Sequence, residues 1–338
     1  MTIQPSPADG LTRRDFVRTA LAAGLAGALQ PLASGCSSLG GLVARRLPTR
    51  VLGRTGQPVT ILGLGGAYFA HRQDEAETRA ILEAALEGGV RLFDTSCDYK
   101  NSEERLGPVL APVRDRVFII TKVNGYDRAT AEAELTLSLK RLRTDYVDLL
   151  LLHGVGLRES PQKADLMLGP GGALELLQEA KRSGRTRFIG MSAHPGNDTA
   201  DRFFEASDAW DVVMPFINYL APAQHPAAGA LIEKARRRNV GVVGMKTLGG
   251  SGQLAVDYDA AFRYVLSVPG VACALVGVKS VDEVRRAVQA ARAFRPLAPR
   301  EMDALLARGA GLAHDGAPAS TLLLAHAMAD RGAQMHFS

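Results

Sequence analysis

The stretches Arg116-Val-Phe-Ile-Ile-Thr-Lys122 and Asp145-Tyr-Val-Asp-Leu-Leu-Leu-Leu-His153 are apolar runs that each end on one basic side chain. A third run, Gly89-Val-Arg-Leu-Phe-Asp94, ends on a carboxylate. Short apolar runs of this kind are typical of strands that are buried on both faces of a parallel sheet. A polar residue that closes such a strand projects from its carboxyl end, where active-site loops begin. The three runs therefore predict barrel strands with functional residues at one shared mouth.

The same pattern repeats along the chain. Apolar runs alternate with amphipathic helical stretches at short spacing, which is typical of an α/β fold with a parallel sheet. Eight strands are expected, at residues 60–65, 90–94, 116–122, 147–152, 186–191, 211–215, 240–245 and 272–277. Arg50 to Thr60, with Thr55-Gly56 as the turn, is predicted to form a hairpin before the first strand. The predicted fold is a (β/α)8 TIM barrel with an N-terminal β-hairpin.

Four side chains are expected to meet at the barrel mouth: Asp94, Tyr99, Lys122 and His153. A free tyrosine titrates near pH 10 and must be tuned to exchange a proton near neutrality. A lysine held close favours the phenolate, a carboxylate orients the lysine, and an imidazole can hydrogen-bond a substrate oxygen. Such a group protonates a carbonyl oxygen while hydride reaches the carbon. No side chain supplies hydride, so the set predicts a nicotinamide or flavin cofactor.

Each of the four residues also has a structural interpretation. Asp94 alone fits a turn or cap residue, Tyr99 a packing residue, and His153 a hydrogen-bonded core histidine. Lys122 is harder to explain in this way. Only 8 of the 40 basic residues are lysines, so a lysine at the end of a buried strand indicates that an amine with a tunable charge matters there.

Ordered motifs extend the pattern: Asp94-Thr-Ser-Cys-Asp-Tyr99, Ser102-Glu-Glu-Arg-Leu-Gly107, Thr121-Lys122 and Leu152-His153. Together they resemble the aldo-keto reductase family, and the resemblance covers residues 49 to 295. It implies that the hairpin closes the barrel floor and that the protein reduces a small-molecule carbonyl. It also implies that Tyr99 is the general acid, assisted by Lys122, Asp94 and His153.

The nearest branch of the family resembles bacterial reductases that carry a C-terminal iron–sulfur module. An iron–sulfur cluster is held by grouped cysteines. This chain has three cysteines, Cys36, Cys97 and Cys273, which lie far apart in the sequence. The module is therefore expected to be absent. Three cysteines give no disulfide framework, although a bond between Cys97 and Cys273 stays open.

The resemblance also predicts where NADP binds. The glycine-rich stretch with Lys246, Leu248 and Gly250 follows a predicted strand, so its backbone can approach a pyrophosphate. Lys279, Ser280 and Arg285 match the family positions that hold the adenosine 2′-phosphate. Two cations and a hydroxyl favour NADP over NAD, with an exposed basic helix face as the alternative. Ser192 and Asn218 are expected to contact the cofactor.

Three positions depart from the family pattern near the nicotinamide. Ala193 stands where an asparagine is usual, Met214 where glutamine is common, and Ile217 where a stacking tyrosine is common. Alanine and methionine offer no amide hydrogen bonds. Asn218 and His194 are the candidates to replace those contacts.

The amino terminus carries a second signal. Thr12-Arg-Arg-Asp-Phe-Val-Arg18 precedes an apolar stretch from Thr19 to Leu29 and resembles a twin-arginine (Tat) export signal. Leu32-Ala-Ser-Gly-Cys36 resembles a lipoprotein cleavage site, which keeps lipidation of Cys36 open. We therefore expect a signal peptide at 1–35, a linker or lipid tether at 36–48, the barrel at 49–315 and a tail at 316–338. The predicted location is the periplasm or cell envelope, with the Tat machinery as a partner.

Charge gives no indication of a nucleic-acid partner. The formal net charge is +5. Residues 1–35 contribute three Arg and two Asp, so removing them takes away +1 and leaves +4. A charge this small and scattered does not form a nucleic-acid footprint. Membrane contact is expected only through the signal or a lipid at Cys36.

The substrate-contacting segments are expected to be the loop from Gly154 to Gly172 and the tail from Ala298 to Ser338. Arg158, Met167 and the run from Leu322 to Leu324 are the candidates within them.

Two other classes of function stay open. One is an NADP-binding sensor or assembly protein with little turnover, which the altered nicotinamide positions motivate. The other is a metal-dependent hydrolase that uses His153, His194 and Asp94, although no His-x-His pair follows the first strand and Lys122 would place a cation beside the metal.

Overall fold

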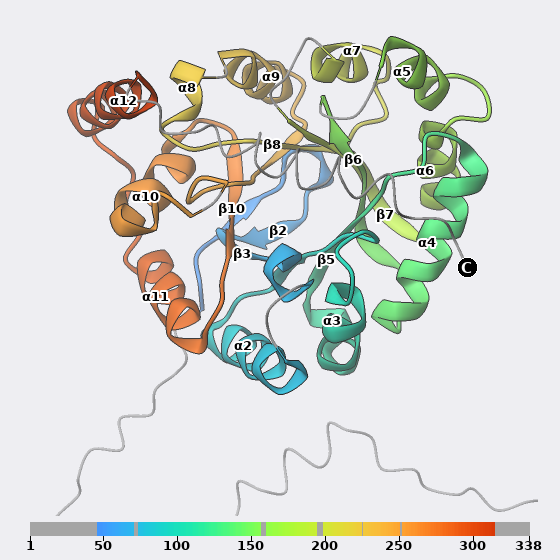
Figure 1. Ribbon diagram of the computed structural model, residues 1–338, viewed down its shortest axis with the longest axis horizontal. Helices are drawn as coiled ribbons and strands as arrows, with labels where there is room; N and C mark the ends of the chain where they lie inside the picture. The colour runs from blue at the N-terminus through green and yellow to red at the C-terminus, as the bar shows by residue number, and fades with distance from the viewer. Residues whose placement is uncertain are drawn as a thin grey trace, which may run out of the picture. The chain divides into compact units, whose positions relative to one another are not determined.

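The eight expected strands form a closed parallel barrel (Figure 1). The structure, a computed structural model, describes residues 46–70, 74–156, 160–194, 199–224, 226–250 and 252–314. Its barrel strands are β3 (Leu62–Gly65), β4 (Leu92–Asp94), β5 (Phe118–Val123), β6 (Val147–Val155), β7 (Thr186–Ala193), β8 (Val212–Pro215), β9 (Gly241–Gly244) and β10 (Val271–Gly277). Because β10 pairs with both β9 and β3, the sheet has no open edge. The predicted (β/α)8 barrel is therefore confirmed.

Helices cover the outside of the barrel, as Figure 1 shows. The helices are α2 (Glu75–Gly88), α3 (Ser102–Leu110), α4 (Arg128–Leu142), α5 (Pro161–Leu168), α6 (Ala173–Arg182), α7 (Thr199–Glu205), α8 (Ala221–Gln224), α9 (Pro226–Arg237), α10 (Tyr258–Ser267), α11 (Val281–Arg292) and α12 (Pro299–His314). Short 3-10 turns are η1 (Gly53–Thr55), η2 (Gly66–Ala70), η3 (Ala111–Arg116) and η4 (Ala255–Asp257). Local sequence sets several helix starts. Asp74 accepts a hydrogen bond from Glu77 N at 2.6 Å, and Asp127 caps α4 in the same way.

The predicted hairpin closes the barrel floor. Strands β1 (Thr49–Val51) and β2 (Pro58–Thr60) pair antiparallel, with Thr49 opposite Thr60. Leu52 and Val59 are buried and pack with the side chains of the barrel interior. Leu52 also lies against Gly241, the first residue of β9. The hairpin therefore covers the amino-terminal end of the strands and leaves the carboxyl end for the site.

The barrel interior is filled by side chains and forms a packed core. Its cluster includes Leu92, Ile120, Leu149, Leu151, Val212, Met214, Val243, Cys273 and Leu275. Gly63 leaves room for this packing, because a Cβ there would lie 2.6 Å from Leu92 and 2.7 Å from Leu275. Fully burying one aliphatic side chain contributes about 1.5–3 kcal/mol. This core therefore provides a rigid base for the residues at the mouth.

The predicted loop from Gly154 to Gly172 contains a helix, α5. Ser160 caps it by accepting a hydrogen bond from Lys163 N, and Pro161 takes the first helical position. Met167, a candidate substrate contact, lies on α5 and is 1% exposed because its side chain packs into the core. That assignment is therefore wrong.

Several predictions fall on segments outside the described residues. These are the signal at 1–35, most of the linker at 36–48, Arg158, and the tail at 316–338 with the run from Leu322 to Leu324. Within the described ranges, none of the helices combines the length and apolar composition that crossing a membrane requires.

Candidate active site

The structure brings Asp94, Tyr99, Lys122 and His153 together at the carboxyl end of the barrel. Asp94 is the last residue of β4, Lys122 lies near the end of β5, and His153 lies near the end of β6. Tyr99 comes from the segment between β4 and α3. These three strands are neighbours in the barrel, so parallel pairing alone places the ends of the runs side by side.

A buried ion pair forms the centre of the site. The Lys122 Nζ atom lies 2.6 Å from Asp94 Oδ1 and donates a second hydrogen bond to Thr95 O at 2.5 Å. Burial raises the pKa of Asp94, and the Lys122 charge opposes that rise. The same ammonium lies 4.8 Å from the centroid of the Tyr99 ring. A fixed positive charge therefore stands beside the phenol, where it favours loss of the phenolic proton.

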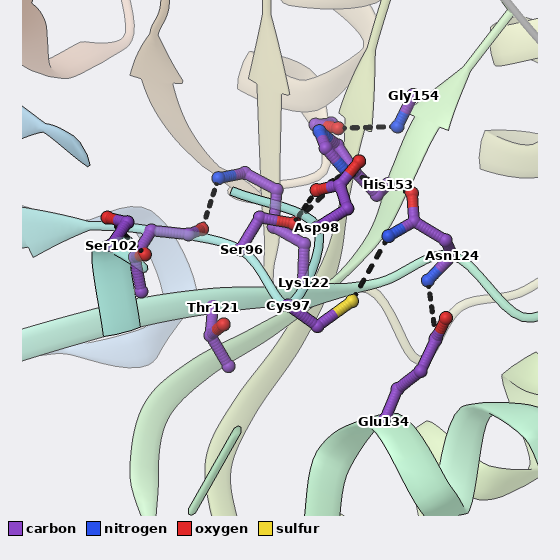
Figure 2. A network of polar contacts seen from close by, with 12 residues as sticks. Ser96, Cys97, Asp98, Ser102, Thr121, Lys122, Asn124, Glu134, His153 and Gly154 are labelled. Atoms are coloured by element: carbon purple, nitrogen blue, oxygen red, sulfur yellow. Dashed lines mark hydrogen bonds and ion pairs between the residues drawn. The ribbon is translucent and has the colours of Figure 1, made fainter. Parts of the chain in front are cut away.

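The His153 ring packs against the Tyr99 ring in a T-shaped arrangement. The two ring centroids are 5.5 Å apart with an interplanar angle of 75°. The His153 side chain is 6% exposed. Three further side chains, which the sequence did not identify, surround its Nδ1 atom: Ser96, Asp98 and Asn124 (Figure 2). Asp98 directly precedes Tyr99 in the chain, and this adjacency is the one sequence feature that indicates a position near the site.

A second buried carboxylate lies behind the site. Glu103 accepts a hydrogen bond from Thr121 Oγ1 at 2.6 Å, and its other oxygen lies 3.6 Å from Arg141. Burial raises the pKa of Glu103. Since Thr121 precedes Lys122, this contact fixes the strand end that carries the ammonium.

Cys97 and Cys273 are both free thiols, so the disulfide that the sequence left open does not form. The two residues have separate surroundings. Cys273 packs in the barrel interior, whereas Cys97 accepts a hydrogen bond from Asn124 Nδ2 at 3.1 Å. Burial raises the pKa of the Cys97 thiol well above its usual range, so the thiol stays protonated at neutral pH.

The side chains of Ser192 and Asn218 are committed to the protein backbone. Ser192 Oγ accepts from Gly154 N at 2.8 Å, directly after His153. Asn218 Oδ1 accepts from Leu220 N at 3.0 Å, and Asn218 Nδ2 donates to Lys246 O at 3.1 Å. Both residues are almost fully buried. These hydrogen bonds stabilise the chain around the mouth, and the cofactor contact expected of both residues stays a prediction.

The loop after β9 has an unusual backbone, and it carries an amine that forms no ion pair with the described residues. Lys246 has φ +59°, a left-handed conformation uncommon for residues with a side chain. Burial and the charge of Lys122 lower the pKa of Lys246 to about 8. No carboxylate of the described part of the chain lies within ion-pair distance of its amine. Thr247 Oγ1 is also buried without a hydrogen-bond partner among the described residues.

The other predicted loop residues differ in their surroundings. Leu248 packs against the core, and its carbonyl accepts from Leu254 N at 3.0 Å. Gly250 is half-buried. Gly249 has φ +78°, so a glycine suits the turn here.

The three predicted phosphate-binding residues lie at the start of α11. Ser280 caps the helix, and Lys279 N donates to Glu283 Oε2 at 2.7 Å. The Lys279 amine lies 4.9 Å from the Tyr68 ring centroid. Arg285 pairs with Asp282 at 2.9 Å, and both side chains are exposed. The two basic residues thus lie at the start and in the second turn of α11, and the carboxylates of Asp282 and Glu283 contact Arg285 and the Lys279 backbone.

Metal chemistry finds no support at this mouth. Across the described ranges, no three His, Cys, Asp or Glu side chains are grouped as a metal site requires. The Lys122 ammonium occupies the position beside Asp94 that a cation would need.

Comparisons with known proteins agree with this geometry. The family model described as "Aldo/keto reductase family" matches residues 61–260. A D-galacturonate reductase from Fragaria ananassa is 32% identical over 156 residues, which are 40% of this chain and 47% of that protein. The matched region therefore spans about half the length of that relative. An uncharacterized oxidoreductase, YqkF, from Bacillus subtilis is 24% identical over 76% of this chain and 94% of its own length.

Solved structures show the same fold. A putative aldo-keto reductase from Pseudomonas aeruginosa is 30% identical, with a TM-score of 0.62 over 72% of this chain and 95% of that one. An aldo-keto reductase from Klebsiella pneumoniae, solved in complex with NADPH, has a TM-score of 0.65 at 21% identity over 78% of this chain and 95% of that one. The family match covers more than half of the chain, and the closed parallel barrel agrees with that match: the chain belongs to the aldo/keto reductase family of oxidoreductases.

Proposed function

We propose that the protein uses NADPH to reduce the carbonyl group of an aldehyde, ketone or sugar to an alcohol. The observation that carries the proposal is the contact of Lys122 with Asp94 and with the Tyr99 ring, beside His153. These groups can deliver a proton to an oxygen at the barrel mouth. The family supports oxidoreductase chemistry in general.

Each side chain has one task in this reaction. A bound nicotinamide supplies the hydride, which adds to the carbonyl carbon. The electrons of the broken carbonyl π bond move to the oxygen, and Tyr99 gives its phenolic proton to that oxygen. Lys122 stabilises the resulting phenolate, and Asp94 holds Lys122 in place. His153 donates a hydrogen bond to the substrate oxygen.

The loop after β9 fits the diphosphate of a dinucleotide. The amine of Lys246 has no anionic partner among the described residues, and Thr247 Oγ1 is buried without a hydrogen bond. Gly249 allows the backbone to turn tightly after Lys246 and Thr247. A diphosphate supplies the negative charge and the acceptor oxygens that these groups need.

NADP is proposed over NAD because of the groups at the start of α11. Lys279, Ser280 and Arg285 offer two positive charges and a hydroxyl to a 2′-phosphate. Asp282 pairs with Arg285 at the surface, and such an exposed pair is worth only about 0–1 kcal/mol. A phosphate can therefore replace the Asp282 carboxylate as the partner of Arg285.

The altered nicotinamide contacts favour one second candidate, an NADP-binding sensor or assembly protein with little turnover. Met214 is buried in the barrel core, and Ala193 has no polar side chain. Asn218, one possible replacement, uses its amide on the backbone. This candidate is supported if the protein binds NADPH yet reduces no carbonyl.

The test of the proposed function is NADPH oxidation by the purified protein with a panel of aldehydes, ketones, quinones and sugars. Uronic acids belong in the panel because one relative is a D-galacturonate reductase. We expect turnover with at least one carbonyl class and faster turnover with NADPH than with NADH. A preference for NADH would contradict the role of Lys279, Ser280 and Arg285.

A substitution at Lys246 tests the diphosphate site. Lys246→Met is expected to weaken NADPH binding about 10-fold or more, since a charge-assisted hydrogen bond is worth about 1.5–3 kcal/mol. Because the pKa of Lys246 is about 8, binding by the wild type should weaken as pH rises through 8, and binding by the variant should not. Fluorescence titration with NADPH at several pH values measures both effects. Lys140→Met, at an exposed position on α4, is the control.

The same substitution should stabilise the protein without cofactor. The pKa of Lys246 is lower in the folded chain than its ordinary 10.5, so the unfolded chain binds more protons between about pH 8 and 10.5. The wild type therefore becomes more stable as pH rises across that window. Below about pH 8 the full free-energy cost of burying the charged amine is present. Lys246→Met removes the penalty, so its melting temperature at pH 7 should exceed that of the wild type. Equal melting temperatures combined with equal NADPH affinity would place the amine outside the site.

We further propose export to the cell envelope by the twin-arginine route. The Arg13-Arg14 pair and the apolar stretch after it carry this proposal. Because this route moves folded proteins, NADP bound in the cytoplasm can travel with the enzyme and be recycled between two substrates. The replacement of both Arg13 and Arg14 by lysine is expected to retain the protein in the cytoplasm, as cell fractionation measures, whereas Arg18→Lys should leave export intact. Export of the double variant at the wild-type level would refute this route.

A further inference from the structure

Three oxygen atoms surround a single nitrogen of the His153 ring. Its Nδ1 atom lies 3.0 Å from Asn124 Oδ1, 3.1 Å from Ser96 Oγ and 3.2 Å from Asp98 Oδ1. Asn124 follows strand β5, whereas Ser96 and Asp98 follow β4, so the oxygens come from two separate loops. Figure 2 shows these side chains gathered around the imidazole.

All three oxygens act as acceptors toward Nδ1. A carboxylate has no proton to donate, and the amide oxygen of Asn124 is an acceptor only. The Ser96 hydroxyl donates its proton to Asp98 Oδ1 at 2.6 Å, so it offers a lone pair to the ring. Nδ1 of His153 must therefore carry a proton.

The acceptors are held in place by further contacts. Asn124 Nδ2 donates to Cys97 Sγ at 3.1 Å, which directs the amide oxygen toward the ring. The backbone N–H groups of Asn124 and Gly125 both donate to Glu134 Oε2, at 2.7 and 2.9 Å. The His153 side chain is 6% exposed and that of Asp98 is 19% exposed. The arrangement is thus partly shielded from water, where charge-assisted contacts are strong.

A proton fixed on Nδ1 limits what the other ring nitrogen can do. In a neutral imidazole one nitrogen is a donor and the other an acceptor, so Nε2 of a neutral His153 could only accept. Donation from Nε2 to a carbonyl oxygen requires a second proton on the ring. The carboxylate of Asp98, at ion-pair distance, balances the charge of that form.

We propose that Asp98 is a positioning residue that holds Nδ1–H of His153 and stabilises the doubly protonated ring, so that His153 meets the substrate oxygen as an imidazolium. The proposal rests on the proposed carbonyl reduction for its functional meaning. It differs from a neutral histidine donor, because the imidazolium adds a full positive charge where negative charge develops on the oxygen.

Other charged and titratable groups lie at the carboxyl ends of the barrel strands. They are Asp94 at the end of β4, Tyr99 after it, Lys122 on β5, His194 after β7 and Lys246 after β9. The two lysines oppose a positive charge on the ring, and the carboxylates favour it. Lys122 and Asp94 largely compensate each other as an ion pair, whereas Asp98 contacts the imidazole itself.

Nitrogen NMR of the ring tests the proposal without any need for turnover. In the full chain labelled with ¹⁵N-histidine, His153 is assigned by the loss of its signals in His153→Gln. We expect the neutral ring to carry its proton on Nδ1 and Nε2 to titrate. In Asp98→Asn, which keeps the shape and the acceptor oxygen but removes the charge, that titration should move down by about one to two pH units. Asp303→Asn, the same change on exposed α12, should leave it unmoved.

The pH dependence of kcat/KM gives an independent readout. Because the imidazolium form loses its proton at lower pH in Asp98→Asn, carbonyl reduction by that variant should decline at lower pH than in the wild type. The two enzymes should differ least at acid pH. A loss of rate that is equal at every pH would indicate a structural effect and would contradict the proposal.

Two NMR results would overturn the inference: a neutral wild-type ring with its proton on Nε2, or the same titration midpoint in wild type and Asp98→Asn. The first does not depend on Asp98→Asn, so it decides the matter even if that variant does not fold. Failure of the proposed function has a different signature. In that case the NMR titration would behave as expected while no carbonyl in the panel is reduced.

Discussion

Tyr99→Phe is expected to lower kcat for carbonyl reduction about 10²- to 10⁴-fold, the range that general acid catalysis contributes. The variant keeps the ring, and with it the contacts to Lys122 and His153. It loses only the hydroxyl that gives a proton to the carbonyl oxygen. NADPH binding should therefore remain close to that of the wild type. Steady-state kinetics together with a binding titration separates the two effects.

Tyr146→Phe is the matched control for that substitution. The Arg114 guanidinium carbon lies 3.9 Å from the centroid of the Tyr146 ring. Tyr146 directly precedes β6, at the end of the strand opposite to His153, so loss of its hydroxyl should not change kcat. If Tyr99→Phe reduced carbonyls as fast as the wild type, Tyr99 would not be the acid.

Lys122→Met is expected to damage both activity and stability. Removing one partner of a buried ion pair typically costs about 3–5 kcal/mol, because the other charge is left uncompensated. Here the remaining charge is Asp94, 5% exposed. The kcat of Lys122→Met should also fall, because no ammonium would then lie beside Tyr99. Urea unfolding and kcat measure the two effects.

The loss of stability should depend on pH in a defined direction. Burial raises the pKa of Asp94 above its ordinary 3.8, and Lys122 opposes the rise, so in the variant the pKa should rise further. The folded variant then binds the Asp94 proton more tightly than the unfolded chain does, and its stability falls as pH rises above about 4. Lys122→Met should therefore be closest to the wild type in acid and furthest from it at neutral pH.

A second substitution checks the cause. Asp94→Asn combined with Lys122→Met removes the stranded charge and should recover a large part of the stability but not the activity. Lys140→Met is the control for loss of an exposed lysine. If Lys122→Met had the same unfolding free energy as the wild type at pH 7, the ion pair would not carry the stability assigned to it.

The barrel could be predicted because strand burial leaves a direct trace in the sequence. Runs such as the one from Val147 to Leu152 are apolar at every position but Asp148. A polar residue stands at or near the end of three of these strands, β4, β5 and β6. Parallel pairing then brings Asp94, Lys122 and His153 to one mouth. Their proximity follows from the fold and needs no knowledge of side-chain orientation.

The surroundings of His153 could not be predicted in the same way. Ser96, Asp98 and Asn124 reach it from two loops, and neither loop has a period that fixes where its side chains point. The hydrogen bonds of Ser192 and Asn218 could not be predicted for the same reason. Their positions were foreseeable, but their hydrogen bonds to Gly154 N and Lys246 O depend on the local backbone. By contrast, α5 had a visible start in Ser160-Pro161, which the expectation of a loop overlooked.

Hydride transfer to a carbonyl is tested by following deuterium from NADPH that carries deuterium at both C4 positions to the product. The wild type should place deuterium on the former carbonyl carbon of at least one compound in the panel, and Tyr99→Phe should do so at a rate lower by about 10² or more. A wild-type protein that binds NADPH but transfers deuterium to no carbonyl would contradict carbonyl reduction as its function. The sensor interpretation would then be the better one.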